Sequence, residues 1–232
     1  MKTVAFIGAY DKTDLILYTA KILSMANKRI LVVDSTIMQK MRYVLPTITP
    51  TRNYITEFEN IDFAIGFTSL NDIEQYIGNG GISSRYDIIL LDIDSQGAMK
   101  NLEIDKIDNN LFVTGFDVYS IKRGFSIIHN TMNYTNFSKV IFSKEMSKRE
   151  NEYLDYLASQ YNVIWDDKLF DFPLELGNYA VTMDNQIAQR IKIKGLSNNY
   201  KYALQYMIES IFNDEIPPKE VSKLIKILEK EV

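Results

Sequence analysis

The chain has 232 residues, of which 46% are hydrophobic and 24% are charged, and these values are typical of a globular protein. Its formal net charge is −4, so the chain as a whole is not a nucleic-acid-binding polycation. It contains no cysteine and a single histidine, which excludes disulfides, thiolate metal sites, cysteine nucleophiles and two-histidine metal motifs.

The N-terminal stretch MKTVAFIGAYD carries one lysine and a short apolar run that ends at a turn. It lacks the apolar length and the small-residue cleavage site of a signal peptide. No segment approaches the roughly 18 consecutive apolar residues that a membrane span requires. We therefore expect a cytoplasmic protein.

Apolar runs alternate with amphipathic stretches in the first half of the chain. The patterns predict strands at 3–9, 29–34, 63–67 and 86–94, and helices at 13–27 and 70–78. Residues 35–60, which include Pro46 and Pro50, are predicted mostly as loops. The stretch YDIILLDID at 86–94 is the strongest strand signal, and it ends in the carboxylates of Asp92 and Asp94.

The alternation continues in the second half. It predicts strands at 109–116, 139–143 and 161–166, and helices at 117–133, 145–160, 198–213 and 218–231, with a long connection over 168–188. This order is typical of an α/β fold with a doubly wound, mainly parallel sheet flanked by helices. We expect a single domain at 1–213, followed by a C-terminal amphipathic helix at 217–232.

Polar residues and glycines collect where the predicted strands end. Gly8, Asp34, the Asp92 and Asp94 pair, and Asp117 each follow or close an apolar run. Ligands of such sheets bind beyond the carboxyl ends of the strands. The pattern would suit a Mg²⁺-nucleotide if the loop after Gly8 allows one.

Several stretches of the sequence resemble the MinD/ParA family, the deviant-P-loop ATPases that position cell-division, partition and secretion machinery. FIGAYDKTDLILYTAKILSMANKRILVVDS is similar to the strand, phosphate loop, helix and second strand of that family. YDIILLDIDSQG, LFVTGFDVYSIKRG and KVIFSK resemble its later strands, and the likeness covers roughly residues 1–213. It implies a P-loop NTPase-like fold.

The resemblance also implies roles for individual residues. Gly8 would open the phosphate loop, Lys12 would reach the phosphates, Asp34 would lie at the first switch, and Thr13 and Asp92 would face Mg²⁺. Tyr10, Asp11 and Asp14 lie in or next to the same nucleotide-binding loop.

The loop departs from the family pattern. Only Ala9, Tyr10 and Asp11 separate Gly8 from Lys12, so the loop is about two residues short of the G-x-x-x-x-G-K spacing, and the signature lysine of the family is absent. Asp11 would place a negative charge near the phosphates, and Tyr10 would fill space that a nucleotide needs. Without a ligand, Asp11 or Thr13 can cap the following helix, and Asp14 suits its dipole.

Two later segments offer other surfaces. Arg190, Lys192 and Lys194 alternate in QRIKIKG, which forms either a solvated face or a DNA contact within residues 190–201. Leu224 and Leu228 share the apolar face of the last helix, which docks onto its own chain, onto a partner or onto a membrane surface.

These observations favour a non-catalytic, pseudo-ATPase member of the fold that needs no cofactor and acts as an adaptor or positioning factor. Its contacts with a protein partner or a second copy would involve the rim near Asp94 and Asp117. One alternative is a Mg-ATP or Mg-ADP switch that controls dimerisation and hydrolyses ATP. The other is an accessory protein that binds DNA or a membrane surface.

Overall fold

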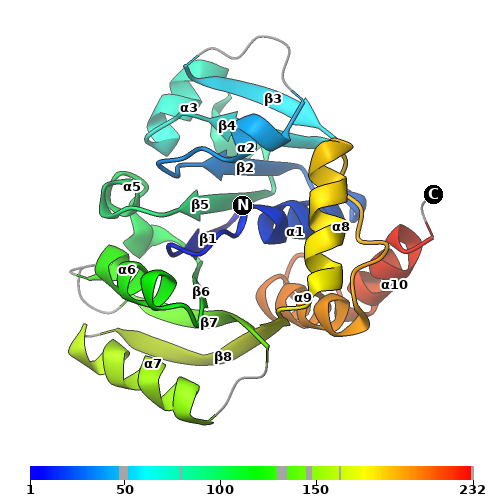
Figure 1. Ribbon diagram of the computed structural model, residues 1–232. Coiled ribbons are helices and arrows are strands. Elements are labelled where there is room, and N and C mark those ends of the chain that lie inside the picture. Colours follow the sequence, from blue (N-terminus) through cyan, green and yellow to red (C-terminus); the bar gives the residue numbers. More distant parts are fainter. Residues whose placement is uncertain (47–51, 79, 130–134, 145–147, 162, 231–232) are drawn as a thin grey trace.

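A computed structural model gives the arrangement of residues 1–46, 52–78, 80–129, 135–144, 148–161 and 163–230. Within these ranges, one sheet of eight strands runs through the middle of the molecule in the order β3-β4-β2-β5-β1-β6-β7-β8 (Figure 1). The strands are β1 Lys2–Ile7, β2 Ile30–Asp34, β3 Tyr54–Phe58, β4 Ile61–Ile65, β5 Ile88–Ile93, β6 Asn109–Gly115, β7 Asn136–Ser143 and β8 Ile164–Pro173.

All neighbouring strands are parallel except β3, which pairs antiparallel with β4. The register sets the carboxyl ends of the central strands side by side. Ile7 of β1 lies opposite Ile93 of β5, and Asp34 of β2 lies opposite Asp92. The sheet itself therefore brings the loop after β1 next to both carboxylates.

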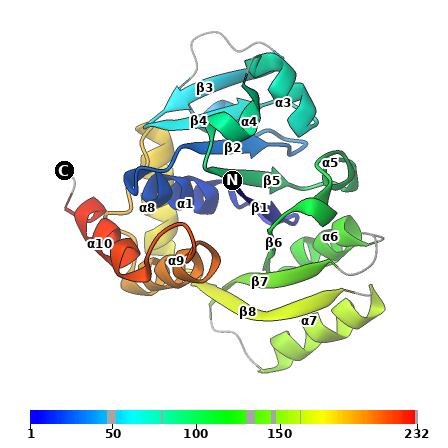
Figure 2. The ribbon, with the colours of Figure 1, turned by 180° about the vertical axis from the view of Figure 1, so that it is seen from behind.

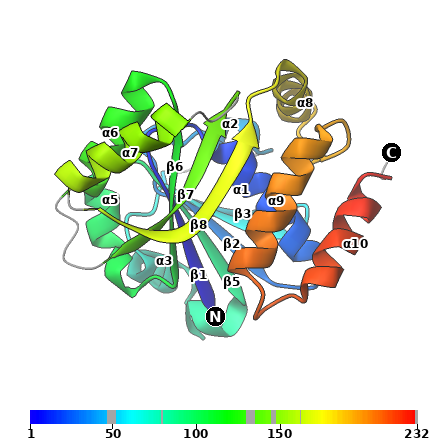
Figure 3. The ribbon, with the colours of Figure 1, turned by 90° about the horizontal axis from the view of Figure 1, so that it is seen from below.

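Helices cover both faces of the sheet, as Figures 2 and 3 show. One face carries α1 Thr13–Met25, α8 Leu176–Ile187, α9 Asn198–Ile211 and α10 Pro218–Leu228; the other carries α3 Leu70–Ile77, α4 Gly81–Arg85, α5 Gln96–Asn101, α6 Val118–Ile128 and α7 Lys148–Gln160. Two short pieces, α2 Met41–Val44 and the 3₁₀ turn Ile104–Lys106, complete the described elements.

The core has two layers because side chains alternate along each buried strand. Val4 and Phe6 of β1 pack with α1, α9 and α10, whereas Ala5 and Ile7 pack on the opposite face. This doubly wound, mainly parallel α/β sheet confirms the predicted fold class. None of the helices in the described ranges is both long enough and apolar enough to span a bilayer.

The prediction of a long connection over 168–188 is wrong. The last strand runs on to Pro173, and α8 follows. Both elements carry polar residues where a buried element would carry apolar ones. β8 is an edge strand that pairs with β7 alone and exposes Asp167 and Asp171, and the inward positions of α8 are Asn178 and Asn185.

Two described stretches within residues 35–60, a range predicted mostly as loops, form α2 and β3. β3 and β4 form a hairpin whose two turn residues, Glu59 and Asn60, have positive φ angles of 50° and 63°. Such angles are typical of the tight hairpin turn that matches strand twist. The strand predicted at 161–166 begins at Ile164 and is longer than expected. The first three residues of the helix predicted at 145–160 lie outside the described residues.

Candidate functional site

The site begins at Gly8, where β1 ends. Its φ angle is +151°, and a Cβ atom at this position would lie 2.1 Å from the carbonyl oxygen of Val113 on β6. No side chain fits in that space, so the close approach of the neighbouring strand requires glycine here. The backbone then turns through Ala9, Tyr10 and Asp11 and enters α1 at Thr13.

The side chain of Lys12 is buried. Its Nζ lies 2.8 Å from Oδ1 of Asp92 and donates to the carbonyl oxygen of Gly8 at 3.1 Å. Both charged side chains are only 3% exposed. The ammonium group that the resemblance assigns to phosphate is thus bound by the carboxylate that the resemblance assigns to Mg²⁺.

The two carboxylates at the strand ends differ in their partners. Burial raises the pKa of Asp92 to about 6, the ammonium of Lys12 opposes that rise, and the charge of Asp34 adds to it. Burial also raises the pKa of Asp34, although this carboxylate accepts hydrogen bonds from the backbone and hydroxyl of Thr36 and from the backbone of Met41. Asp34 therefore fixes the loop after β2.

Asp11 and Thr13 bind each other at the start of α1. Oδ1 of Asp11 accepts from the backbone N–H of Thr13 at 3.1 Å, and its other oxygen forms an ion pair with Lys40. Burial disfavours the charge of Asp11, but Lys40 and Thr13 hold its pKa below the usual value. The Thr13 side chain is 3% exposed.

Tyr10 occupies the other side of the loop. Its ring stacks on Phe142 with centroids 4.8 Å apart, and a Cβ at Gly115 would lie 2.9 Å from it. Burial raises the pKa of the Tyr10 phenol to about 12. The tyrosine is therefore a packed part of the loop at this edge.

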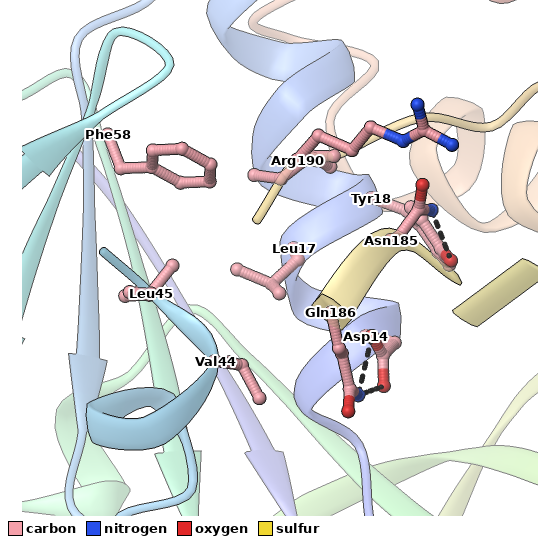
Figure 4. A pocket seen from close by; sticks show the side chains of 10 residues that line it. Asp14, Leu17, Tyr18, Val44, Leu45, Phe58, Asn185, Gln186 and Arg190 are labelled. Atoms are coloured by element: carbon pink, nitrogen blue, oxygen red, sulfur yellow. Dashed lines mark hydrogen bonds between the residues drawn. The ribbon is translucent and has the colours of Figure 1, made fainter. Parts of the chain in front are cut away.

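Asp14 lies in the first turn of α1 and faces α8. Nε2 of Gln186 donates to both carboxylate oxygens of Asp14, at 3.2 and 2.9 Å, and Nδ2 of Asn185 donates to the hydroxyl of Tyr18 (Figure 4). Burial raises the pKa of Asp14 to about 6. Polar contacts of this kind hold α8 against α1.

Asp94 and Asp117, the other predicted site residues near the strand ends, accept hydrogen bonds from backbone groups of their own chain. Asp94 accepts from the backbone N–H of Ile37 at 3.0 Å, and Asp117 caps α6 by accepting from the N–H of Ser120 at 2.8 Å. The residues of the loop, together with Met38, Lys40, Tyr43, Asp92 and Asp94, line a pocket of about 320 Å³. In the described ranges, no three acidic or histidine side chains gather closely enough to hold a metal ion.

A Mg²⁺-phosphate group does not fit this donor set. Asp92, which would face the metal, is bound by the ammonium group of Lys12, and the carboxylate of Asp11 accepts from the backbone N–H of Thr13. Asp11 adds a carboxylate at the position where a phosphate would need neutral backbone N–H groups.

The other predicted residues lie far from this loop in the sequence. Arg190 and Lys194 are exposed and Lys192 is half-buried, while Ile191 and Ile193 between them are buried. Leu224 and Leu228 are 7% and 1% exposed and belong to the core formed with α1 and α9. The apolar face of α10 is therefore covered by its own chain.

Sequence reasoning missed Lys40 and a set of exposed apolar side chains at this end of the molecule. We call the second set the apolar rim: it comprises Ile37, Met38, Tyr43, Val118, Tyr119, Leu174, Leu176 and Tyr179, which are 48–90% exposed. All of them follow the carboxyl ends of β2, β6 and β8. Large apolar residues just after the predicted strand ends at 34 and 116 were the signal that could have found Ile37, Met38, Val118 and Tyr119. No such signal marked Leu174, Leu176 and Tyr179, because that strand was predicted to end at residue 166.

Comparisons with known proteins bear on the fold. No family model matches the sequence, and neither does any curated protein. Among solved structures, a ParA family ATPase from Chlorobium tepidum superposes with a TM-score of 0.63 at 12% identity, covering 90% of this chain and 98% of that one.

Two further neighbours share the fold. The MinC:MinD cell division protein complex of Aquifex aeolicus matches with a TM-score of 0.55 at 12% identity over 100% of this chain and 97% of that one. A putative plasmid partition protein from Borrelia burgdorferi bound to AMPPNP matches with 0.53 at 9% identity over 93% and 99%. The chain therefore has a MinD/ParA-like, P-loop NTPase-type fold, as the sequence predicts.

Proposed function

We propose that this protein is a non-catalytic, MinD/ParA-like adaptor or positioning factor of partition, conjugation, secretion or pilus assembly. It works in the cytoplasm without a cofactor and binds a protein partner or a second copy of itself. The observation that carries this proposal is the buried Lys12–Asp92 ion pair, 2.8 Å long, whose two side chains are each 3% exposed.

Charge pairing around the loop supports the proposal. A phosphate group would need free cations, but Lys12 is paired with Asp92 and Lys40 is paired with Asp11. Breaking a buried pair costs about 3–5 kcal/mol, because one charge is then left without a partner. The affinity for a nucleotide would be reduced by this free energy if its binding required Lys12 to leave Asp92.

The apolar rim supports a role in protein contacts. Contiguous apolar patches on a protein surface mark interaction sites more often than scattered single residues do. Met38 and Tyr43 line the 320 Å³ pocket, and Leu176 at the start of α8 is 90% exposed. One of the solved neighbours is a MinD protein in complex with MinC, so this fold can carry a protein partner.

The second candidate is a Mg-ATP-dependent dimerisation switch. The pocket of about 320 Å³ lined by Lys12, Thr13 and Asp92 favours it, and one solved neighbour is bound to AMPPNP. In that case Lys12 must leave Asp92 when nucleotide enters.

A DNA contact through the exposed Arg190 and Lys194 is a third candidate. A membrane contact by α10 has little support, because Leu224 and Leu228 are buried and leave that helix without an exposed apolar face.

Calorimetry with Mg-ATP and Mg-ADP tests the proposal. We expect no binding at millimolar nucleotide and no rise in melting temperature, because a ligand that binds only the folded state would raise it. Micromolar binding that is lost in Lys12→Ala would overturn the proposal in favour of the switch.

Partner capture with the tagged protein from its source cells tests the rim. We expect Leu176→Ser and Tyr179→Ser to lose the captured partner. Ile227→Ser serves as the matched control, because Ile227 is 50% exposed on α10 and lies outside the rim. Equal loss in all three variants would contradict a role for the rim.

A further inference from the structure

A second pocket lies on the other side of Tyr10, between the loop, the ends of β7 and β8, and α8. We call it the α8 pocket; its volume is about 270 Å³. Tyr10, Asp11 and Lys40 line both this pocket and the 320 Å³ one, so they form the partition between the two. A ligand of the α8 pocket therefore does not have to displace Lys12 from Asp92.

Aromatic rings form much of the wall. Tyr10 stacks on Phe142, and Phe142 in turn stacks on Phe172 with centroids 5.2 Å apart. Tyr200 and Tyr179 also line the pocket. The faces of such rings attract cations, and the attraction grows as water is excluded.

The charged groups of the wall are mostly acidic. Asp11, Asp14 and Glu175 face one lysine, Lys40, which is already paired with Asp11. Asp14 accepts from the neutral amide of Gln186 and feels the charge of Lys40 from a distance, and no ion pair joins Asp14 or Glu175 to a cation of the described residues. The pocket thus holds uncompensated negative charge, which repels phosphate and attracts a cation.

Tyr200 supplies a polar group that a ligand of the pocket can reach. The residue is 6% exposed and lines the pocket, and no described residue is hydrogen-bonded to its hydroxyl group. Burial, together with the nearby Tyr18 and Asp14, raises the pKa of this phenol well above its usual value, so it stays neutral. The hydroxyl oxygen can accept from a cationic N–H that enters the pocket.

We propose that the α8 pocket receives an arginine or lysine side chain of a partner polypeptide. The alkyl stem packs between the rings of Tyr10, Phe142 and Tyr179, and the cationic head meets Asp14, Glu175 and the hydroxyl of Tyr200. The exposed Leu174, which lines the pocket, and Leu176, two residues further along the chain, then take apolar residues that flank the basic one. This inference rests on the proposed adaptor function, since it names the chemistry of the partner.

Two-dimensional NMR of the labelled full-length protein tests the pocket. The probe is the capped peptide Ala-Leu-Arg-Leu-Ala, and its control carries neutral citrulline in place of arginine. We expect saturable shifts of the amides of Tyr10, Asn178 and Tyr179 with the arginine peptide and weak or no shifts with the citrulline peptide. Equal shifts with both peptides would overturn the proposal.

Variants locate the charge that matters. Glu175→Gln changes an exposed side chain that makes no cap hydrogen bond and should weaken binding about threefold, and Asp14→Asn should weaken it about tenfold. Asp184→Asn is the matched control, because Asp184 is exposed on α8 and does not line the pocket. A loss in Asp184→Asn as large as in Glu175→Gln would mean that only general attraction acts.

Two further titrations separate the possible outcomes. Free arginine amide distinguishes the source of the cation: affinity equal to that of the peptide would overturn the assignment to a polypeptide. Mg-ATP distinguishes this inference from the proposed function. Tight Mg-ATP binding with intact peptide shifts refutes the pseudo-ATPase alone, whereas absence of both responses refutes the pocket alone.

Discussion

Helices α1 and α8 lie on the same face of the sheet, but they are held in place in different ways. The first buries nine residues, among them Leu15, Ile16 and Leu23, and forms part of the larger core layer. The second buries only Asn178 and Asn185, and it exposes Leu176 and Ile187 at 90% and 83%.

The difference shows which interactions stabilise each side of the site. Apolar burial fixes α1 and with it the loop that carries Lys12, because each fully buried aliphatic side chain contributes about 1.5–3 kcal/mol. Hydrogen bonds hold α8, and each contributes only about 0.5–1.5 kcal/mol. The site thus has one wall fixed by apolar burial and one wall held mainly by hydrogen bonds, to which Val181 adds a partly buried apolar contact.

The largest expected effect concerns the ion pair on the rigid side. Lys12→Ala leaves Asp92 buried without its partner and should lower the free energy of unfolding by about 3–5 kcal/mol. Urea denaturation at pH 7 measures this loss. The double variant Lys12→Ala/Asp92→Asn should recover part of it, and a loss below about 1 kcal/mol in the single variant would show that the pair contributes little.

A pair of leucine substitutions compares the two helices directly. Leu15→Ala on α1 removes a side chain that is 1% exposed and should cost about 2–5 kcal/mol. Leu176→Ala on α8 should change stability by no more than about 0.5 kcal/mol. Thermal or urea unfolding of both variants is sufficient, and equal losses would contradict the distinction between the helices.

The attachment of α8 can be weakened by itself. Nδ2 of Asn185 donates to the carbonyl oxygen of Lys192 at 2.7 Å and to the hydroxyl of Tyr18 at 3.2 Å. Asn185→Ala should cost about 1–2 kcal/mol. Hydrogen exchange should speed up across α8 and stay unchanged in α1; faster exchange in both helices would show that they unfold together.

The smallest effect is a dependence on pH. Burial raises the pKa of Asp14 to about 6 from a usual value of 3.8, so the folded protein binds more protons than the unfolded chain between those values. Stability therefore falls as the pH rises from about 4 to 6, and the cost is complete above pH 6.

Asp14→Asn removes the contribution of that residue. Its stability relative to the native protein should increase by roughly 1 kcal/mol as the pH rises through this window, a figure reduced because the group is partly exposed. Denaturation at a series of pH values measures the slope. The part of the slope due to Asp92 should remain, and an unchanged slope would show that Asp14 has an ordinary pKa in the folded state.

The sequence predicted those parts of the fold that depend on apolar burial. Continuous apolar runs such as YDIILLDID become central strands, and the register then places Asp34 and Asp92 together. It failed where polar residues face inward, as at Asn178 and Asn185, since no apolar period marks such a helix.

At the site, the sequence identified the loop from Gly8 to Thr13 but not the pairing within it. The distance between Lys12 and Asp92 depends on how β1 and β5 align, and 80 residues of chain separate the two positions. The pairing of Asp11 with Lys40 was equally hidden, because Lys40 lies in a stretch predicted as loop. Ion pairs between distant positions have no local pattern.

The space around Gly8 has a consequence for the evolutionary record of such loops. The carbonyl oxygen of Val113 leaves no room for a Cβ atom at this position, whether or not a phosphate is bound. Selection for folding alone would therefore preserve this glycine in a lineage that had abandoned nucleotides. A signature that counts the first glycine of the loop as a mark of ATP binding will include such lineages.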